Sequence, residues 1–193
     1  MDYLCYHLHE LPECAADLSL LSPGEQQLYA QRPLSSRIAR CLLKQELARR
    51  LHKAPHTIEL TTNEHGKPAL PGNELYFNIS HSANLLCLAF HHAPVGVDIQ
   101  QIRPDAATRR LAKRIMCPQQ LNIWESLGAT ADDFFASWCV AEALVKHAGA
   151  TVWQAREFPF LYHHGRVETL FEGAPNIKIF SPAAGYCGAV ATS

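Results

Sequence analysis

The chain has no excess of either charge and no long hydrophobic run. Its 193 residues carry 17 Lys and Arg against 18 Asp and Glu, a formal net charge of −1, whereas a nucleic-acid-binding protein usually shows a basic excess. The longest apolar stretch, Leu85–Phe90, is far shorter than the roughly 20 residues that a transmembrane helix needs. The N-terminus lacks a basic segment followed by an apolar run, so we expect no signal peptide. These absences predict a cytoplasmic protein that binds neither nucleic acid nor membranes.

Paired cysteines and the signature loops of common enzyme classes are also missing. The seven cysteines are odd in number and form no C-x-x-C pair, which fits neither a zinc site nor a disulfide framework. We expect buried or idle thiols in a reducing compartment. The chain contains no G-x-S-x-G elbow and no Walker A loop. Ser80 and His81 are adjacent, which makes a Ser–His–Asp triad with Asp98 difficult to orient.

The spacing of the apolar residues predicts a mixed α+β fold. Apolar residues make up 48% of the chain and charged residues 18%, an ordinary globular balance. The expected helices are 20–32, 35–52 and 130–147, and the expected strands are 3–8, 57–62, 75–79, 85–90, 95–100, 158–162, 166–171, 176–180 and 185–191. Strands and helices are mixed without a βαβ rhythm, which favours the α+β class.

A weak internal sequence repeat suggests two similar halves. The segment 76–90 resembles the segment 176–190, since each has a strand, a serine with a small-residue turn, and a second strand that holds a cysteine. The halves would be residues 1–101 and 102–193, which meet near Ile102–Ala106 and act as a single unit. Hairpins often look alike, so the repeat alone is a weak signal.

The strand 95–100 (VGVDIQ) presents a carboxylate. Side chains alternate along a strand, so the valines and the isoleucine face a core while Gly96, Asp98 and Gln100 share the other face. A glycine there leaves room for another group to approach the backbone. Asp98 is therefore either a functional carboxylate or an edge-strand side chain in solvent.

The helix 130–147 carries a second carboxylate in an apolar setting. Thr130 is a suitable N-cap and Gly149 a suitable C-terminal stop. At about 100° per residue, Glu142 falls within an arc of aromatic and small apolar residues, where an unpaired carboxylate is costly. Lys146 lies one turn on, so the sequence allows either a simple Glu142–Lys146 helix pair or a functional site.

Two turns and one helix face offer groups that suit phosphate. FNISHS (77–82) runs from a strand into a polar turn with Ser80 and His81, which is either a phosphate cradle or an ordinary hairpin turn. Lys67 stands between a glycine and a proline in a turn, a position where a lysine is usually solvated. Arg40 belongs to a basic row on the second helix, which by itself reads equally well as a solvated edge.

The order of these motifs resembles that of the surfactin-type 4′-phosphopantetheinyl transferases. GKP (66–68) precedes FNISHS (77–82), then GVDI (96–99) with Arg-Pro at 103–104, then F-x-x-W-x-x-x-E-A-x-x-K (135–146). The resemblance covers the chain from about Arg37 to Gly149. It implies a monomer of two similar α/β halves with the active site in the cleft between them. It also implies transfer of 4′-phosphopantetheine from coenzyme A to a serine of an apo acyl or peptidyl carrier protein, an acidic helical domain.

The resemblance assigns a metal and catalytic role to four residues. Asp98 and Glu142 would be carboxylate ligands of Mg²⁺, with Gln100 as a weak or water-mediated ligand, and oxygen ligands suit that cation. Lys146 would neutralise the diphosphate of coenzyme A. Glu142 would also orient or deprotonate the incoming serine hydroxyl.

The resemblance assigns four further residues to coenzyme A. Arg40 and His81 would contact the ribose 3′-phosphate. Lys67 would lie near the adenine nucleotide, and Ser80 would contribute through the backbone of its turn. Lys146 would therefore serve both in catalysis and in binding coenzyme A.

The sequence departs from the family pattern at three positions. Gln100 stands in place of a glutamate and lacks its negative charge. Ala141 stands where a lysine usually precedes Glu142, and Cys41 follows Arg40 where a hydroxyl residue is common. Each change removes charge or hydrogen bonding from the site. The alternative function is therefore a catalytically weakened module that still binds coenzyme A or a carrier protein.

Overall fold

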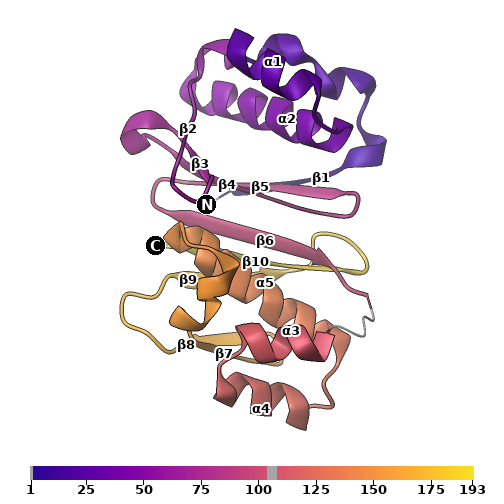
Figure 1. Cartoon of the computed structure of the whole chain (residues 1–193), viewed down its shortest axis with the longest axis vertical. Coiled ribbons are helices and arrows are strands. Elements are labelled where there is room, and N and C mark those ends of the chain that lie inside the picture. Colours follow the sequence, from indigo (N-terminus) through magenta and orange to yellow (C-terminus); the bar gives the residue numbers. More distant parts are fainter. Residues whose placement is uncertain (1, 104–107) are drawn as a thin grey trace.

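The N-terminal part of the chain forms a three-stranded antiparallel sheet covered by helices (Figure 1). The structure, a computed structural model, describes residues 2–103 and 108–193. The strand order is β1–β5–β4, with β1 at Asp2–His7, β4 at Tyr76–Ser82 and β5 at Leu85–His91. Helices α1 (Pro23–Ala30) and α2 (Leu34–Leu51) lie above this sheet in Figure 1. The apolar stripe of α2 packs on Leu86, Leu88 and Phe90 of β5.

A second three-stranded antiparallel sheet comes from the later part of the chain. Its order is β6–β10–β9, with β6 at Val95–Gln101, β9 at Asn176–Phe180 and β10 at Tyr186–Thr192. Helix α5 (Ala131–Ala148) packs on β6 and β10, and α3 (Thr108–Ile115) and α4 (Pro118–Ser126) flank it (Figure 1). The remaining strands form two short hairpins, β2 (Thr61–Thr62) with β3 (Pro68–Ala69) and β7 (Phe160–His163) with β8 (Arg166–Thr169).

The strand β5 explains how the two sheets form one body. Its even-numbered residues face α2, whereas Leu85, Cys87 and Ala89 pack against Val97, Ile99 and other residues of the second sheet. The strand is therefore buried on both faces, which accounts for its uninterrupted apolar sequence. The valines and the isoleucine of β6 are completely buried, so the predicted core face of that strand is confirmed.

The predicted α+β class is confirmed, with local differences. The expected strand 57–62 is a 3-10 turn at Pro55–Thr57 followed by only two strand residues, Thr61–Thr62. The expected turn at Ser80 and His81 continues β4 as strand to Ser82. The expected helix 20–32 is α1, which begins at Pro23, and the Glu25 carboxylate caps it by accepting the Ser22 backbone N–H at 3.1 Å. The expected helix 130–147 is α5, and the structure adds α3 and α4 before it.

The two sheets have the same strand order. In the first sheet β1 pairs with β5, the second strand of the β4–β5 hairpin, and in the second sheet β6 pairs with β10, the second strand of the β9–β10 hairpin. Strand β6 thus corresponds to β1. It was expected to end the N-terminal half, but it is hydrogen-bonded to β10 of the second sheet. The expected junction near Ile102–Ala106 falls largely on residues 104–107, outside the described residues.

All seven cysteines are free thiols. Four of them form two close pairs, with Sγ–Sγ distances of 3.2 Å between Cys5 and Cys87 and 3.5 Å between Cys139 and Cys187. In residues 2–103 and 108–193, none of the helices has the length and apolar character needed to cross a bilayer.

Candidate active site

Strand β6, which carries Asp98, meets β4 through side chains rather than through backbone pairs. On its other edge β6 pairs with β10 in the usual antiparallel way. On the β4 edge its backbone N–H groups donate to side-chain oxygens: Val97 to Asn78 Oδ1 at 2.8 Å, Ile99 to Ser80 Oγ at 3.2 Å and Gln101 to Ser82 Oγ at 3.0 Å. The two strands therefore lie one side chain apart.

Two lysines satisfy backbone carbonyls on the same edge of β6. Lys67 Nζ donates to the Val95 carbonyl at 3.1 Å, and Lys146 Nζ donates to the Val97 carbonyl at 3.3 Å. Lys67 Nζ also donates to the backbone carbonyl of Lys146 at the end of α5. Buried carbonyls need such partners. Lys67 therefore ties the β2–β3 turn to β6 and α5, and Lys146, which also donates to Ser80 Oγ at 3.4 Å, helps to join β6 to β4.

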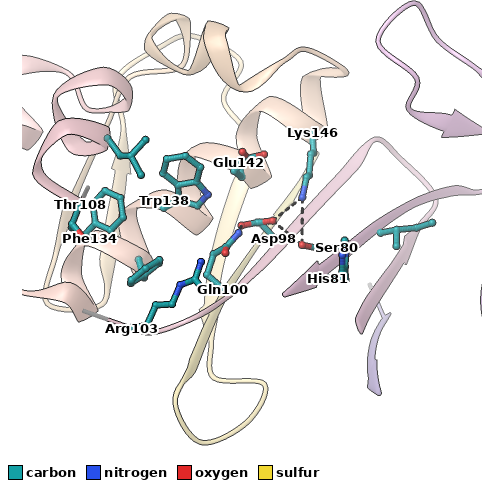
Figure 2. A pocket seen from close by; sticks show the side chains of 13 residues that line it. Ser80, His81, Asp98, Gln100, Arg103, Thr108, Phe134, Trp138, Glu142 and Lys146 are labelled. Atoms are coloured by element: carbon teal, nitrogen blue, oxygen red, sulfur yellow. Dashed lines mark hydrogen bonds and ion pairs between the residues drawn. The ribbon is translucent and has the colours of Figure 1, made fainter. Parts of the chain in front are cut away.

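Asp98 is 2% exposed and accepts hydrogen bonds on both carboxylate oxygens. Oδ1 accepts from Ser80 Oγ at 2.7 Å and from Lys146 Nζ at 2.7 Å, while Oδ2 accepts from Gln100 Nε2 at 3.0 Å (Figure 2). Lys146 thus pairs with Asp98 across the two elements, and the helix pair with Glu142 does not form. The amide nitrogen of Gln100, rather than its oxygen, faces Asp98.

Gly96 explains why α5 can lie so close to β6. A Cβ atom at this position would stand 2.1 Å from the Ala143 carbonyl oxygen and 2.4 Å from the His147 backbone nitrogen. The group that approaches the bare backbone is therefore α5 itself. This contact brings Glu142 and Lys146 over Asp98, as Figure 2 shows.

Glu142 is a half-buried carboxylate without a compensating hydrogen bond. Among the residues that the structure describes, none donates a hydrogen bond to it. Burial raises its pKa, the Asp98 charge raises it further, and the Lys146 charge opposes both. An anionic group held in this way favours a bound cation or a transferable proton.

These groups line one cavity of about 370 Å³. Its polar side holds six of the predicted site residues: Ser80, His81, Asp98, Gln100, Glu142 and Lys146. Its other side is aromatic and aliphatic, with Phe134, Phe135, Trp138 and Leu111, and Arg103 also reaches it. A ligand with charged groups at one end and an apolar chain at the other suits such a lining.

A second cavity, of about 270 Å³, adjoins the first and contains Arg40. His81 and Ile79 line both cavities. Arg40 Nε donates to the Tyr29 hydroxyl at 2.8 Å. Its Nη1 is buried without a hydrogen-bond partner and lies 3.7 Å from Glu25 Oε1. A fixed guanidinium with an unsatisfied N–H group suits an anionic ligand.

Lys67 and Ala141 lie apart from the two cavities. Gly66 and Pro68 line the second cavity, but Lys67 turns toward β6 and α5 instead. Its pKa is lowered to about 8, chiefly by burial and then by the Lys146 charge. Ala141 is 1% exposed and packs in the core beneath α5, so the lysine of the family pattern would have to leave that core to reach a ligand.

The side chains of Asn78 and Ser82 also belong to the site; the FNISHS motif contains both, but neither was assigned a role of its own. Together with Ser80 they form a polar row at every second position of β4, which alternates with buried Phe77 and half-buried Ile79. Such a row on a strand in the middle of a protein requires partners. The period-two pattern was visible in the sequence, but its partner strand was not.

Comparison with known proteins agrees with this geometry. The model of the 4′-phosphopantetheinyl transferase superfamily matches residues 94–190, which include β6, all of α5 and most of the closing hairpin. The chain therefore belongs to the 4′-phosphopantetheinyl transferase superfamily.

Individual relatives match over different shares of their length. The chain is 33% identical over 152 residues to the 4′-phosphopantetheinyl transferase AcpT of Escherichia coli O157:H7, which covers 74% of this chain and 73% of the relative. It is 32% identical over 98 residues to a 4′-phosphopantetheinyl transferase of Bacillus subtilis, covering 49% and 43%. It is 28% identical over 111 residues to Sfp of Bacillus subtilis strain 168, covering 56% and 49%. The chain thus spans about half the length of the two Bacillus relatives.

Proposed function

We propose that this chain transfers the 4′-phosphopantetheine moiety of coenzyme A to a serine of an apo acyl or peptidyl carrier protein and releases adenosine 3′,5′-bisphosphate. Membership of the superfamily supports the reaction class. The observation that carries the proposal is the meeting of Asp98, Glu142 and Lys146 in one cavity. Two carboxylates and one ammonium, held by two sheets and a helix, can bind a cation and a diphosphate together.

Asp98 and Glu142 fit a divalent cation, for which we propose Mg²⁺. The two carboxylates repel each other, because the Asp98 charge raises the Glu142 pKa. A cation between them would remove this electrostatic repulsion. Gln100 would contribute its oxygen only after rotation of its amide, or would act through water. Bound Mg²⁺ would neutralise charge on the diphosphate during transfer.

Lys146 and Glu142 would act on the two ends of the reaction. The serine oxygen of the carrier attacks the β-phosphorus of coenzyme A, and the bond from that phosphorus to the oxygen bridging to the α-phosphate breaks. Glu142, whose pKa is raised, accepts or orients the serine proton. Lys146 shifts from Asp98 toward the leaving phosphate and offsets its negative charge.

The nucleotide of coenzyme A would occupy the second cavity. Arg40 lines this cavity with a guanidinium held by Tyr29 and Glu25, which supports its proposed contact to the 3′-phosphate. His81 lines both cavities and would contact the same group from the other side. Ser80 lies in β4 rather than in a turn and would act by positioning Asp98. Lys67 would lie near the adenine nucleotide after its side chain turned away from the Val95 carbonyl.

We also propose how the chain is organised around this site. The first sheet supplies Ser80 and His81 and the second sheet supplies Asp98, so a single chain provides both walls and a monomer suffices. The halves proposed at 1–101 and 102–193 would act as one unit. Seven free thiols suit a reducing compartment, and we place the activity in the cytoplasm.

Intact-protein mass spectrometry tests the transfer. The protein is mixed with coenzyme A, Mg²⁺ and apo carrier proteins from fatty-acid, polyketide and peptide synthesis, and one carrier should gain the mass of phosphopantetheine. The Asp98→Ala variant should leave every carrier unmodified while keeping its fold. If the wild-type protein leaves the whole panel unmodified, the proposed transfer is wrong.

One observation favours the alternative of a weakened binding module. The Gln100 amide nitrogen donates to Asp98 and so occupies a side of the carboxylate that a metal would use. Calorimetry with coenzyme A, together with the Gln100→Glu variant, separates the two functions. A sharp rise in turnover in the variant indicates a tuned enzyme, whereas binding without turnover in both proteins indicates a module.

A further inference from the structure

The end of β1 carries a cluster of metal-ligating side chains that do not line the first cavity. His7, His9 and Glu10 each offer one ligand atom, and these atoms all lie within 4.8 Å of one another. His9 Nε2 is 3.6 Å from Glu10 Oε1, and the His7 and His9 rings are 5.7 Å apart at 71°. Among the described residues, this is the one group of three such side chains that lies so close together.

These distances are near those of a closed metal site. Zinc bonds of about 2.0–2.2 Å in a tetrahedron place neighbouring ligand atoms about 3.4 Å apart. The His9–Glu10 pair already has this separation. His9 and Glu10 are exposed and free to rotate, whereas His7 is half-buried at the strand end. Small rotations of the two exposed side chains toward His7 would therefore complete the site.

The backbone that presents the three residues is held by tertiary contacts. His7 is paired with Leu85 in the sheet. One residue further, the Leu8 N–H donates to the Asn84 carbonyl at 2.8 Å, at the tip of the β4–β5 hairpin. The chain then turns through a 3-10 helix at Leu8–Glu10, which brings His9 and Glu10 back beside His7. The ligands are thus pre-positioned by the fold.

We propose that His7, His9 and Glu10 bind a transition-metal dication of the Zn²⁺ or Ni²⁺ class. Two imidazoles and one carboxylate suit these ions, whereas Mg²⁺ prefers oxygen ligands alone. The proposal is independent of the proposed transfer reaction. It does have a structural consequence for it, because Leu8 lines the second cavity together with His81, so a bound ion would fix one wall of that cavity.

Calorimetry with aqueous Ni²⁺ in excess Mg²⁺ tests the site, because Mg²⁺ occupies oxygen sites without competing for imidazoles. The wild-type chain should bind one Ni²⁺. His9→Ala, at an exposed position, should weaken binding by more than about tenfold, since even second-shell changes cost that much. Glu10→Gln should also weaken it. Hydrogen exchange of the Leu8 amide should slow when the ion binds.

Two controls make the test specific. His163 and His164 form another close imidazole pair, with ring centroids 4.2 Å apart. The variant with alanine at both positions should bind Ni²⁺ as the wild type does. Co²⁺ absorption distinguishes imidazole ligation from binding to the exposed thiol of Cys14, because thiolate ligands add sulfur-to-metal charge-transfer bands. Unchanged binding in His9→Ala, equal loss in the control variant, or thiolate bands with Co²⁺ would each overturn the proposal.

Discussion

The Ser80 hydroxyl donates to Asp98 Oδ1 across 2.7 Å and accepts the backbone N–H of Ile99 across 3.2 Å. One side chain on the first sheet therefore positions both the carboxylate and the backbone of the strand that carries it. Asn78 and Ser82 repeat the backbone contact one step to either side. The candidate site is built on this row of side chains, so its precision depends on residues that need not touch a ligand.

Removal of the Ser80 hydroxyl should destabilise the protein and impair the site. Ser80→Ala leaves the buried Ile99 N–H without a partner, which costs about 1–3 kcal/mol, and removes a donor to Asp98. We expect a lower urea midpoint and reduced pantetheinylation. Ser82→Ala is the matched control, because Ser82 contacts a less buried part of β6. Equal losses in the two variants would contradict the special role of Ser80.

A methyl group at Gly96 should separate α5 from β6. The added Cβ would overlap the backbone at Ala143 and His147, which cannot move without the whole helix, and overpacking of this kind costs about 1–3 kcal/mol or more. Glu142 and Lys146 would move away from Asp98, so activity should fall further than stability alone explains.

Gly24 provides the control for that substitution. A Cβ there meets nothing within 4 Å, and alanine suits a helix better than glycine. Thermal unfolding should show Gly24→Ala to be neutral or stabilising. Similar losses at Gly96 and Gly24 would show that the close approach of α5 does not matter.

Glu142 should reduce stability in the absence of a divalent cation. Its folded-state pKa is raised above the ordinary value of 4.5, so the folded protein binds more protons than the unfolded chain in the window between these pKa values. Stability therefore falls as the pH rises through the folded pKa. Glu142→Gln should remove this fall and be more stable than the wild type at neutral pH without metal.

In the presence of Mg²⁺, the wild type should be more stable than Glu142→Gln. If Asp98 and Glu142 hold Mg²⁺ as proposed, the ion stabilises the folded state, so it should raise the melting temperature of the wild type. It should leave Glu142→Gln unaffected. Differential scanning calorimetry with and without Mg²⁺ measures both effects, with exposed Glu168→Gln as the control. An Mg²⁺ shift that survives in Glu142→Gln would exclude Glu142 as a ligand.

Lys67 should make the protein more stable at alkaline pH. Its folded pKa is lowered to about 8 from the ordinary value of 10.5, so between these values the unfolded chain binds more protons than the folded protein. Stability should rise as the pH increases across this window. Lys67→Met should lack the rise, as judged by urea unfolding at several pH values, whereas Met at exposed Lys53 should retain it.

The sequence by itself determined the local elements and the identity of the reactive groups. Thr130 and Gly149 bound α5 as predicted, with the Thr130 side chain accepting from Asp133 N–H and Gly149 in a left-handed conformation. Strand alternation placed the β6 valines in the core and Asp98 on the other face. These features depend on neighbours within a few residues, where capping and periodicity are strong.

Only the tertiary structure decided which groups meet. Lys146 could have paired with Glu142 on its own helix but pairs with Asp98, because α5 lies against the glycine of β6. The Lys67 side chain points from its turn toward β6 and α5 and donates to their backbone carbonyls. Strand β6 pairs with β10 and not with a strand of the N-terminal sheet. Each choice joins residues tens of positions apart. It depends on how closely the helices and sheets pack, which periodicity along the chain does not encode.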